Sequence, residues 1–361
     1  SMLFFSRYRF MKTTINDIAK KAGLSPTTVS KYLNHKPLRA QNINKIEKAI
    51  AELQYEPSIA AQNLRLQKSD NVHIIISDLG NYFWGPAIAQ INQRLAQFGY
   101  PSLVQSYYYQ ESTKKALIER MISQNPCGAI LLATDIDDDT YQLLSKASIP
   151  TVIVNQIPSA FHKIPIDCVL SDGYAGGVVL AEYLIKKGHK KIFIEAPVSN
   201  SISIRKNIAG ILDTYQQHSL PTPHLDEATK FQKPEILRQY AQNSIQNLLT
   251  LPDPPTAIIF TSYDFTMGGL SALQSFSLHL PEDVSIVAYD DDILFQCVSP
   301  SITAVGQDFE KLGTLAADTL IQRMHGDYSD FPSIKKVPVS FTERNSVYDI
   351  RETGNQSQPL A

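Results

Sequence analysis

Apolar positions near the start of the chain follow the spacing of a short amphipathic helix. One apolar face begins at Ile15 and recurs three, four and seven residues later. Thr14 precedes this face and Asp17 follows three residues on, which is the pattern of a capping box with Asp in place of Glu. Gly23 occupies the position where a helix would end in a left-handed turn. The pattern therefore predicts a capped helix that ends at Gly23.

A second amphipathic helix is predicted directly after this turn. Ser25 is a good N-cap, and Pro26 suits the first helical position, where no amide hydrogen is required. Val29, Tyr32 and Leu33 form its apolar face and leave these polar side chains facing outward: Thr27, Thr28, Ser30 and Lys31. A third amphipathic helix follows, with the apolar positions Ile43, Ile46, Ala49, Ile50 and Leu53. Two short helices joined by a glycine-containing turn are typical of a helix-turn-helix that reads DNA, although a plain helical hairpin has the same pattern.

Beyond about residue 70 the pattern changes to short β-rich runs that alternate with amphipathic helical stretches. The expected strands are Val72–Ser77, Ala129–Ala133, Thr151–Asn155, Lys191–Glu195, Ala257–Phe260 and Ser285–Tyr289. The expected helices include Ala87–Phe98, Thr113–Ser123 and Ala175–Lys187. Alternation of this kind predicts an α/β body in which helices cover parallel sheets.

Charge is divided unevenly between these two regions. The whole chain has a formal net charge of -2, yet residues 11–66 carry nine Lys and Arg against four Asp and Glu. A basic head on an acidic body predicts that only the head contacts a polyanion such as nucleic acid, although a solvated basic surface would look the same. The three cysteines, Cys127, Cys168 and Cys297, are far apart in the sequence, so we expect them to be reduced thiols in the core. No run of about 20 apolar residues occurs that could span a membrane, and we expect a cytoplasmic protein.

Motifs of the common nucleotide-dependent and hydrolytic enzymes are missing from the sequence. The chain contains no GxGxxG, GxxxxGK[ST], GxSxG or HExxH motif. The acidic runs Asp135–Asp139 and Asp290–Asp292 could hold a metal ion, but runs of charge are usually solvated. We therefore expect no enzymatic activity, no metal and no cofactor.

Two segments of the head resemble the DNA-binding head of the LacI/GalR family of repressors: TINDIAKKAGLSPTTVSKYLN (residues 14–34) and AELQYEPSIAAQNLR (residues 51–65). The resemblance implies a homodimer on pseudo-palindromic operator DNA, with residues 58–65 forming a hinge helix only on DNA. It also implies that Leu64 is an apolar wedge that kinks a minor-groove step, although Leu64 could be an ordinary linker residue. The implied DNA contacts are Pro26, Thr27, Thr28, Lys31, Asn34, Leu64 and Arg65. Lys31 stands where many members carry Arg or His, which leaves the preferred base open.

The resemblance extends to about residue 345 and implies a two-lobed, periplasmic-binding-protein-like body that binds a small-molecule effector between its lobes. The expected divisions are an upstream extension or cloning remnant (1–10), a helix-turn-helix domain (11–57), a hinge and linker (58–70), the body (71–349) and a tail (350–361). The first lobe is expected to comprise 71–168 and 302–332, and the second 169–301 and 333–349, with crossings near 167–172, 299–305 and 331–335. The tail has no leucine heptads, so we expect a dimer rather than a tetramer.

Family positions imply which residues contact the effector, although each could instead be structural: Tyr82, Phe83, Trp84, Thr134, Asn155, Arg205, Phe231, Tyr263 and Asp290. Asn155 stands where Asp is usual, and Tyr263 where Asn usually precedes Asp264, so no known member's effector carries over. Arg205 has the planar donor fork that suits paired sugar hydroxyls. We therefore expect a repressor induced by a mono- or oligosaccharide. A corepressor-dependent purine-type regulator and a global catabolite regulator with a phosphoprotein partner remain alternatives, and no membrane partner is expected.

Overall fold

The chain divides into two compact units, Ser1–Lys68 and Ser69–Ala361, here called the head and the body. The computed structural model describes residues 13–33, 36–55, 69–80, 82–132, 137–158, 161, 163–197, 202–228, 233–276 and 278–351. No helix within these ranges is long and apolar enough to cross a membrane.

The described part of the head contains three helices, α1 (Ile15–Ala22), α2 (Pro26–Leu33) and α3 (Ala40–Leu53). The predicted capping box is confirmed, because Thr14 and Asp17 exchange side-chain and backbone hydrogen bonds at the start of α1. Gly23 ends this helix in the left-handed region, with a φ of 65°. Ile18, Val29 and Ile46, one from each helix, are fully buried together. This small core fixes α2 against its neighbours and leaves one side of α2 in water.

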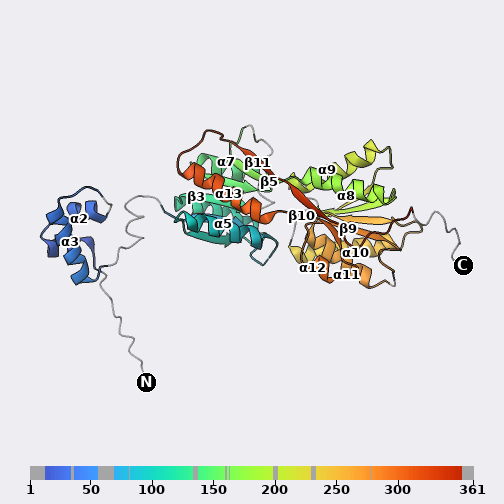
Figure 1. The fold of residues 1–361 in the computed structure, drawn as a ribbon, viewed down its shortest axis with the longest axis horizontal. Coiled ribbons are helices and arrows are strands. Elements are labelled where there is room, and N and C mark those ends of the chain that lie inside the picture. Colours follow the sequence, from blue (N-terminus) through green and yellow to red (C-terminus); the bar gives the residue numbers. More distant parts are fainter. Residues whose placement is uncertain are drawn as a thin grey trace, which may run out of the picture. The chain divides into compact units, whose positions relative to one another are not determined.

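The body contains two six-stranded sheets, one in each lobe (Figure 1). The first-lobe sheet has the order β11 (Ile334–Val337), β5 (Asp167–Ser171), β4 (Thr151–Val154), β3 (Gly128–Leu132), β1 (Val72–Ile76), β2 (Ser102–Ser106). The second-lobe sheet has the order β12 (Val339–Thr342), β10 (Thr303–Gln307), β9 (Ser285–Tyr289), β8 (Ala257–Phe260), β6 (Ile192–Pro197), β7 (His224–Ala228). All neighbouring strands pair in parallel except β10 and β12, which are antiparallel.

Helices cover both faces of each sheet, as the alternating pattern predicts. In the first lobe, one face packs on α5 (Gly85–Gln97) and α13 (Phe309–Met324), and the other on α6 (Glu111–Ser123) and α7 (Asp138–Lys146). In the second lobe, one face packs on α8 (Gly173–Lys186) and α9 (Ile202–Gln217). The opposite face packs on α10 (Pro234–Leu249), α11 (Tyr263–Gln274) and the short α12 (Leu294–Cys297). The predicted strands and helices agree with these bounds to within a few residues.

The expected lobe boundaries are wrong at all three crossings, and the first of them, between residues 168 and 169, falls inside β5 of the first-lobe sheet. Residues 302–332 were assigned to the first lobe, but β10 lies in the second-lobe sheet and the crossing follows it. Residues 333–349 were assigned to the second lobe, but β11 pairs with β5 in the first. Strand β11 lies in the first lobe because the buried carboxylate of Asp167 accepts hydrogen bonds from the backbone and hydroxyl of Ser333, as well as from Arg323. These bonds fix the start of β11 beside β5.

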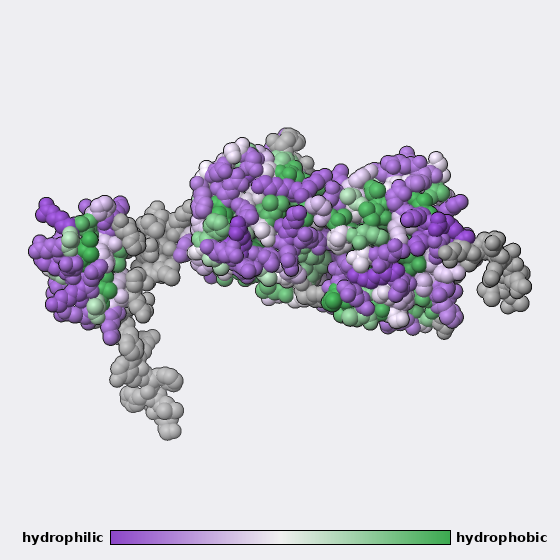
Figure 2. Space-filling model, in the orientation of Figure 1, coloured by the Kyte–Doolittle hydropathy of each residue, from purple (hydrophilic) through white to green (hydrophobic). Residues whose placement is uncertain are grey.

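Most of the visible surface of the body is hydrophilic, with hydrophobic residues scattered over it (Figure 2). Cys127 and Cys168 are buried, as expected of core thiols. Cys297 is exposed, so its expected place in the core is wrong. It lies in the four-residue α12, where Phe295 alone is buried, because so short a helix has little apolar face to bury.

Candidate functional site

The head presents the start of α2 to solvent. Pro26, Thr27 and Lys31 are exposed, while Thr28 is half-buried. The Thr28 hydroxyl lies 2.8 Å from the Ser25 hydroxyl, which itself accepts a hydrogen bond from the Thr28 backbone. This N-terminal face of α2 is therefore ordered by its cap and free to contact another molecule. Three further predicted DNA contacts lie outside the described residues: Asn34, Leu64 and Arg65.

The basic side chains of the head are not equally free. Lys21 forms an ion pair with Glu52 of α3 at 2.8 Å, and Lys21 lowers the pKa of that carboxyl. A lysine held in this way has to leave its partner before it can neutralise a phosphate. We therefore expect Lys20 and Lys31 to contribute more to DNA binding than Lys21.

The body has a pocket at the carboxyl ends of strands from both lobes, where ligands bind in open α/β sheets. Its empty volume is about 660 Å³, solvent at the mouth included. The first lobe contributes Ser77, Phe83, Trp84, Tyr109 and Asn155. The second lobe contributes Ser203, Ile204, Thr261, Ser262, Tyr263, Asp264, Tyr289, Asp290 and Gln307. The pocket thus includes five of the nine predicted effector contacts.

Aromatic rings form much of the apolar wall. Phe83 packs edge-on against both Trp84 and Phe309, with ring centroids 5.4 and 4.5 Å apart. Trp84 is only 5% exposed and belongs to the first-lobe core, so it presents little more than an edge to the pocket. On the other side, Tyr263 stacks on Phe295 at 6.0 Å. These rings offer apolar surface that fits the CH faces of a ligand.

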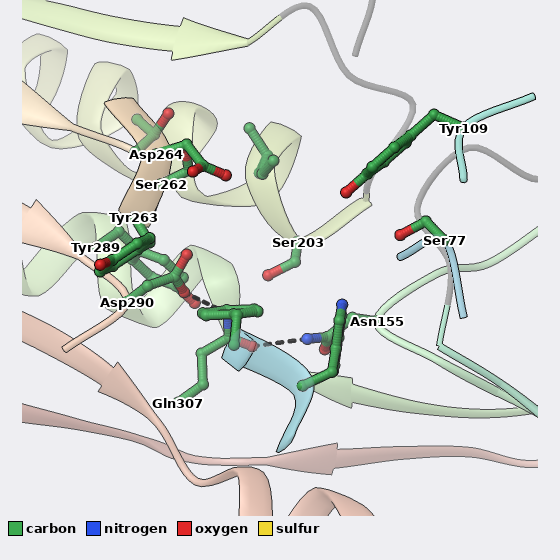
Figure 3. A pocket seen from close by; sticks show the side chains of 14 residues that line it. Ser77, Tyr109, Asn155, Ser203, Ser262, Tyr263, Asp264, Tyr289, Asp290 and Gln307 are labelled. Atoms are coloured by element: carbon green, nitrogen blue, oxygen red, sulfur yellow. Dashed lines mark hydrogen bonds between the residues drawn. The ribbon is translucent and has the colours of Figure 1, made fainter. Parts of the chain in front are cut away.

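A chain of hydrogen bonds crosses the floor of the pocket (Figure 3). Gln307 Nε2 donates to Asp290 Oδ1 at 2.5 Å, and Gln307 Oε1 accepts from Asn155 Nδ2 at 2.7 Å. The same Gln307 oxygen accepts from the hydroxyl of Ser171 at 2.6 Å, and Asn155 Oδ1 accepts from the Ser171 backbone. Ser171 ends β5 and Gln307 ends β10, so both strands next to the crossings take part. The chain joins Asn155 in one lobe to Asp290 in the other.

Asp290 is the acidic group at the centre of this arrangement. Burial raises the pKa of its carboxyl to about 7, while hydrogen bonds from Gln307 and from the Tyr263 backbone act in the opposite direction. Asp290 and Asn155 both have left-handed backbones, with φ values of 75° and 57°. Because side chains other than glycine seldom adopt this region, the two positions are conformationally strained in a way that often marks functional sites.

Several neutral groups in the pocket wall are available for a ligand. Within the described part of the chain, the buried hydroxyl of Ser262 has no hydrogen-bond partner, and those of Ser203 and Tyr289 have no partner other than each other. Asp264 is paired with Arg238 at 2.8 Å, which neutralises its charge. No Lys or Arg is among the described lining residues. The wall therefore suits a ligand rich in uncharged hydroxyl groups.

Among the four remaining predicted contacts, the structure describes the side chain of Arg205 alone. Arg205 follows the lining residues of α9 but is exposed and does not line the pocket. A helical turn places its side chain on a different face from that of Ser203. Thr134 and Phe231 lie outside the described residues, as does the side chain of Tyr82.

Sequence reasoning missed most of the second-lobe wall and the centre of the hydrogen-bond chain. Tyr289 and Gln307 are the last residues of their strands, and Ser77 directly follows β1. A search of every strand end could have found them, since the carboxyl ends of parallel strands meet at one edge. No local signal marks Ser203, whose place depends on how α9 packs.

Comparison with known proteins agrees with this architecture. Residues 14–58 match the lacI family of bacterial regulatory proteins, and residues 181–347 match the periplasmic binding protein-like domain. The probable HTH-type transcriptional repressor ExuR of Bacillus subtilis (strain 168) is 27% identical, over 85% of this chain and 90% of ExuR. The ribose operon repressor of Escherichia coli (strain K12) is 26% identical, over 86% of this chain and 93% of that repressor.

A solved structure extends the likeness to the whole fold. The Lac repressor bound to ONPG in its repressed state has a TM-score of 0.75 at 25% identity, with 93% of this chain and 100% of that chain covered. Because head and body both match, and the relatives align over nearly their whole length, the chain belongs to the lacI family of bacterial regulatory proteins and is a DNA-binding transcriptional repressor.

Proposed function

We propose that a neutral mono- or oligosaccharide controls this repressor. The sugar binds in the pocket between the lobes and causes the repressor to release operator DNA. The observation that carries the proposal is the pocket wall, which combines aromatic rings, buried hydroxyls and the Asp290 carboxyl. Sugar hydroxyls can donate to a carboxylate and accept from protein hydroxyls, while CH faces pack on rings. The ribose operon repressor and the ONPG complex of the Lac repressor support a sugar by their names.

The head would bind DNA as one half of a homodimer acting in the cytoplasm. Two identical recognition helices require half-sites related by two-fold symmetry, so the operator should be pseudo-palindromic. The exposed start of α2, including Thr27 and Lys31, would read bases in the major groove. Leu64 would kink the minor groove between the half-sites. Binding should weaken steeply with salt, because lysines displace counterions from the phosphates.

The switch would act through the crossings between the lobes. An effector can shift operator binding only by its different affinity for two arrangements of the lobes. A ligand that contacts both Asn155 and Asp290 favours the arrangement in which these residues are close. The new arrangement would move the paired hinge segments and prevent residues 58–65 from forming helices on DNA.

Trp84 offers a direct assay, because it is the single tryptophan of the chain and lines the pocket. We would titrate the full-length protein with neutral sugars, sugar acids and nucleobases, and follow tryptophan fluorescence. The same compounds would be added to the protein bound to a fluorescent operator selected from a pseudo-palindromic library. The proposal expects a neutral sugar to change the Trp84 signal and release the operator at the same concentrations.

Other outcomes point to other regulators. If a nucleobase strengthens operator binding, the effector is a corepressor and not an inducing sugar. A response that appears only with a phosphorylated carrier protein would indicate a catabolite regulator. Asp290→Ala serves as the matched variant: it should bind operator without effector and fail to respond to the sugar.

A further inference from the structure

A further hydrogen bond between the lobes lies beside the chain that crosses the pocket floor. Gln156, the neighbour of Asn155, accepts a hydrogen bond at its Oε1 from the backbone N–H of Ile202 at 3.0 Å. Gln156 follows β4 of the first lobe, whereas Ile202 is the first residue of α9 in the second lobe. The first amide groups of a helix have no partner within the helix. The glutamine side chain therefore caps a helix of the opposite lobe.

The side chain of Ile202 also contacts the first lobe. It packs against the apolar core of the first lobe, as Ile157 and Phe161 do, whereas Ile208 and Ile211 of the same helix lie in the second-lobe core. Helix α9 is thus held at its start by one lobe and along its length by the other. Gln156 is only 2% exposed, and the Ile202 amide, at the start of α9, has no partner within the helix that could replace it.

The first turn of α9 is also tied to the first crossing. Helix α8 begins with Gly173 directly after β5, and a Cβ atom at Gly173 would collide with the backbone of Ser203. A Cβ atom at Gly177 would collide with the backbone of Asn207 in the same way. Close approach of this kind makes α8 and α9 move together, since packed backbones cannot slide without a clash. Movement of Ser203 therefore moves the start of α8 and the end of β5.

We propose that Gln156 and the first turn of α9 form an interlobe clasp that stabilises the arrangement in which the effector contacts both lobes. Gln156 is a positioning residue: it does not line the pocket, but it holds Ser203, whose side chain does. The proposal rests on the proposed function, because the clasp couples the same pocket to the same crossings. Without the clasp, the effector has to supply the closing free energy that Gln156 supplies in the native protein.

Two variants separate the hydrogen bond from the volume of the side chain. Gln156→Met keeps the length and removes the acceptor, while Gln156→Glu keeps an acceptor oxygen for the Ile202 amide. Gln216→Met makes the same change at an exposed position of α9 and serves as the control. Hydrogen exchange of the full-length protein without effector measures the clasp itself. We expect the amides of Ile202 and Ser203 to exchange at least several-fold faster in Gln156→Met than in the wild type. Gln156→Glu and Gln216→Met should exchange at the wild-type rate.

The Trp84 titration then measures the coupling. We expect the sugar to bind about tenfold more weakly to Gln156→Met, the effect of one lost buried hydrogen bond, with near-native affinity in Gln156→Glu. Unchanged exchange in Gln156→Met would overturn the clasp. Faster exchange with native sugar affinity would overturn its coupling to the effector. A Gln156→Glu variant as impaired as Gln156→Met would overturn the acceptor role. If no sugar affects the wild type, the proposed function fails and the exchange data alone decide the clasp.

Discussion

Protonation of Asp290 should control effector binding. Burial raises the pKa of this carboxyl from 3.8 to about 7 in the ligand-free protein. A sugar hydroxyl that donates to the carboxylate stabilises the ionised form, so the bound pKa should be lower and binding should release a proton. Affinity is then greatest well above pH 7 and falls as the pH drops below it.

The size of the effect follows from the pKa. About nine tenths of the protein has an ionised Asp290 at pH 8 and about one tenth at pH 6, so the sugar should bind roughly tenfold more weakly at pH 6. Asp290→Asn cannot ionise and should give a flat profile. It should also lose roughly 10- to 100-fold in affinity at pH 8, since a hydrogen bond to a charged acceptor contributes about 1.5–3 kcal/mol.

Trp84 fluorescence titrations at pH 6, 7 and 8 provide the assay. Asp292→Asn is the matched control, because Asp292 lies in the same loop, does not line the pocket, and accepts a backbone hydrogen bond from Leu294 that Asn can also accept. A flat profile in the wild type would refute the reasoning. A profile for Asp290→Asn as steep as that of the wild type would place the titrating group elsewhere.

Three further predictions concern DNA, stability and assembly. Leu64→Ala should lower operator affinity at moderate salt and leave sugar binding unchanged; equal operator affinity by fluorescence anisotropy would contradict the wedge. Burial raises the pKa of Glu195 from 4.5 to about 8, so the stability that its neutral form contributes is complete below pH 4.5 and is lost progressively as the pH rises through 8. Melting temperatures should therefore fall less between pH 7 and 9 in Glu195→Gln than in the wild type, and equal falls would show that Glu195 does not titrate there. Light scattering at micromolar concentration should give a dimer, and a stable tetramer would contradict this prediction.

Local chemistry explains why the head and most of the strands could be predicted from the sequence. A capping box at Thr14 and a left-handed Gly23 depend on residues a few positions apart, and the structure confirms both. Buried parallel strands such as Ala257–Phe260 are continuous apolar runs between helices, so their bounds were predictable as well. Elements whose signal lies within one short segment are the ones that sequence reasoning places correctly.

Lobe assignment needed information that no short segment contains. Strands β10 and β11 are short runs next to a crossing, and nothing in their residue pattern distinguishes a pairing partner in one sheet from a partner in the other. Pairing was decided by distant contacts, such as the hydrogen bonds of Ser333 to Asp167, which lies 166 residues earlier. The expected boundaries were therefore displaced.

The candidate site shows the same division. Asn155 and Asp290 directly follow strands, and the structure places both in the pocket wall. Gln307 was missed because its role depends on two partners, Asn155 and Asp290, that are 152 and 17 residues away. Arg205 was expected from its family position, yet its place on α9 leaves it exposed.

Operator release measured together with pocket occupancy tests the proposed switch most directly. Full-length protein on its fluorescent operator would be titrated with the sugar identified by Trp84, and anisotropy and tryptophan fluorescence would be recorded in parallel. We predict that operator affinity falls at least tenfold and that both signals have the same midpoint. A Trp84 signal that saturates while operator affinity stays unchanged would contradict control of DNA binding by a ligand in this pocket.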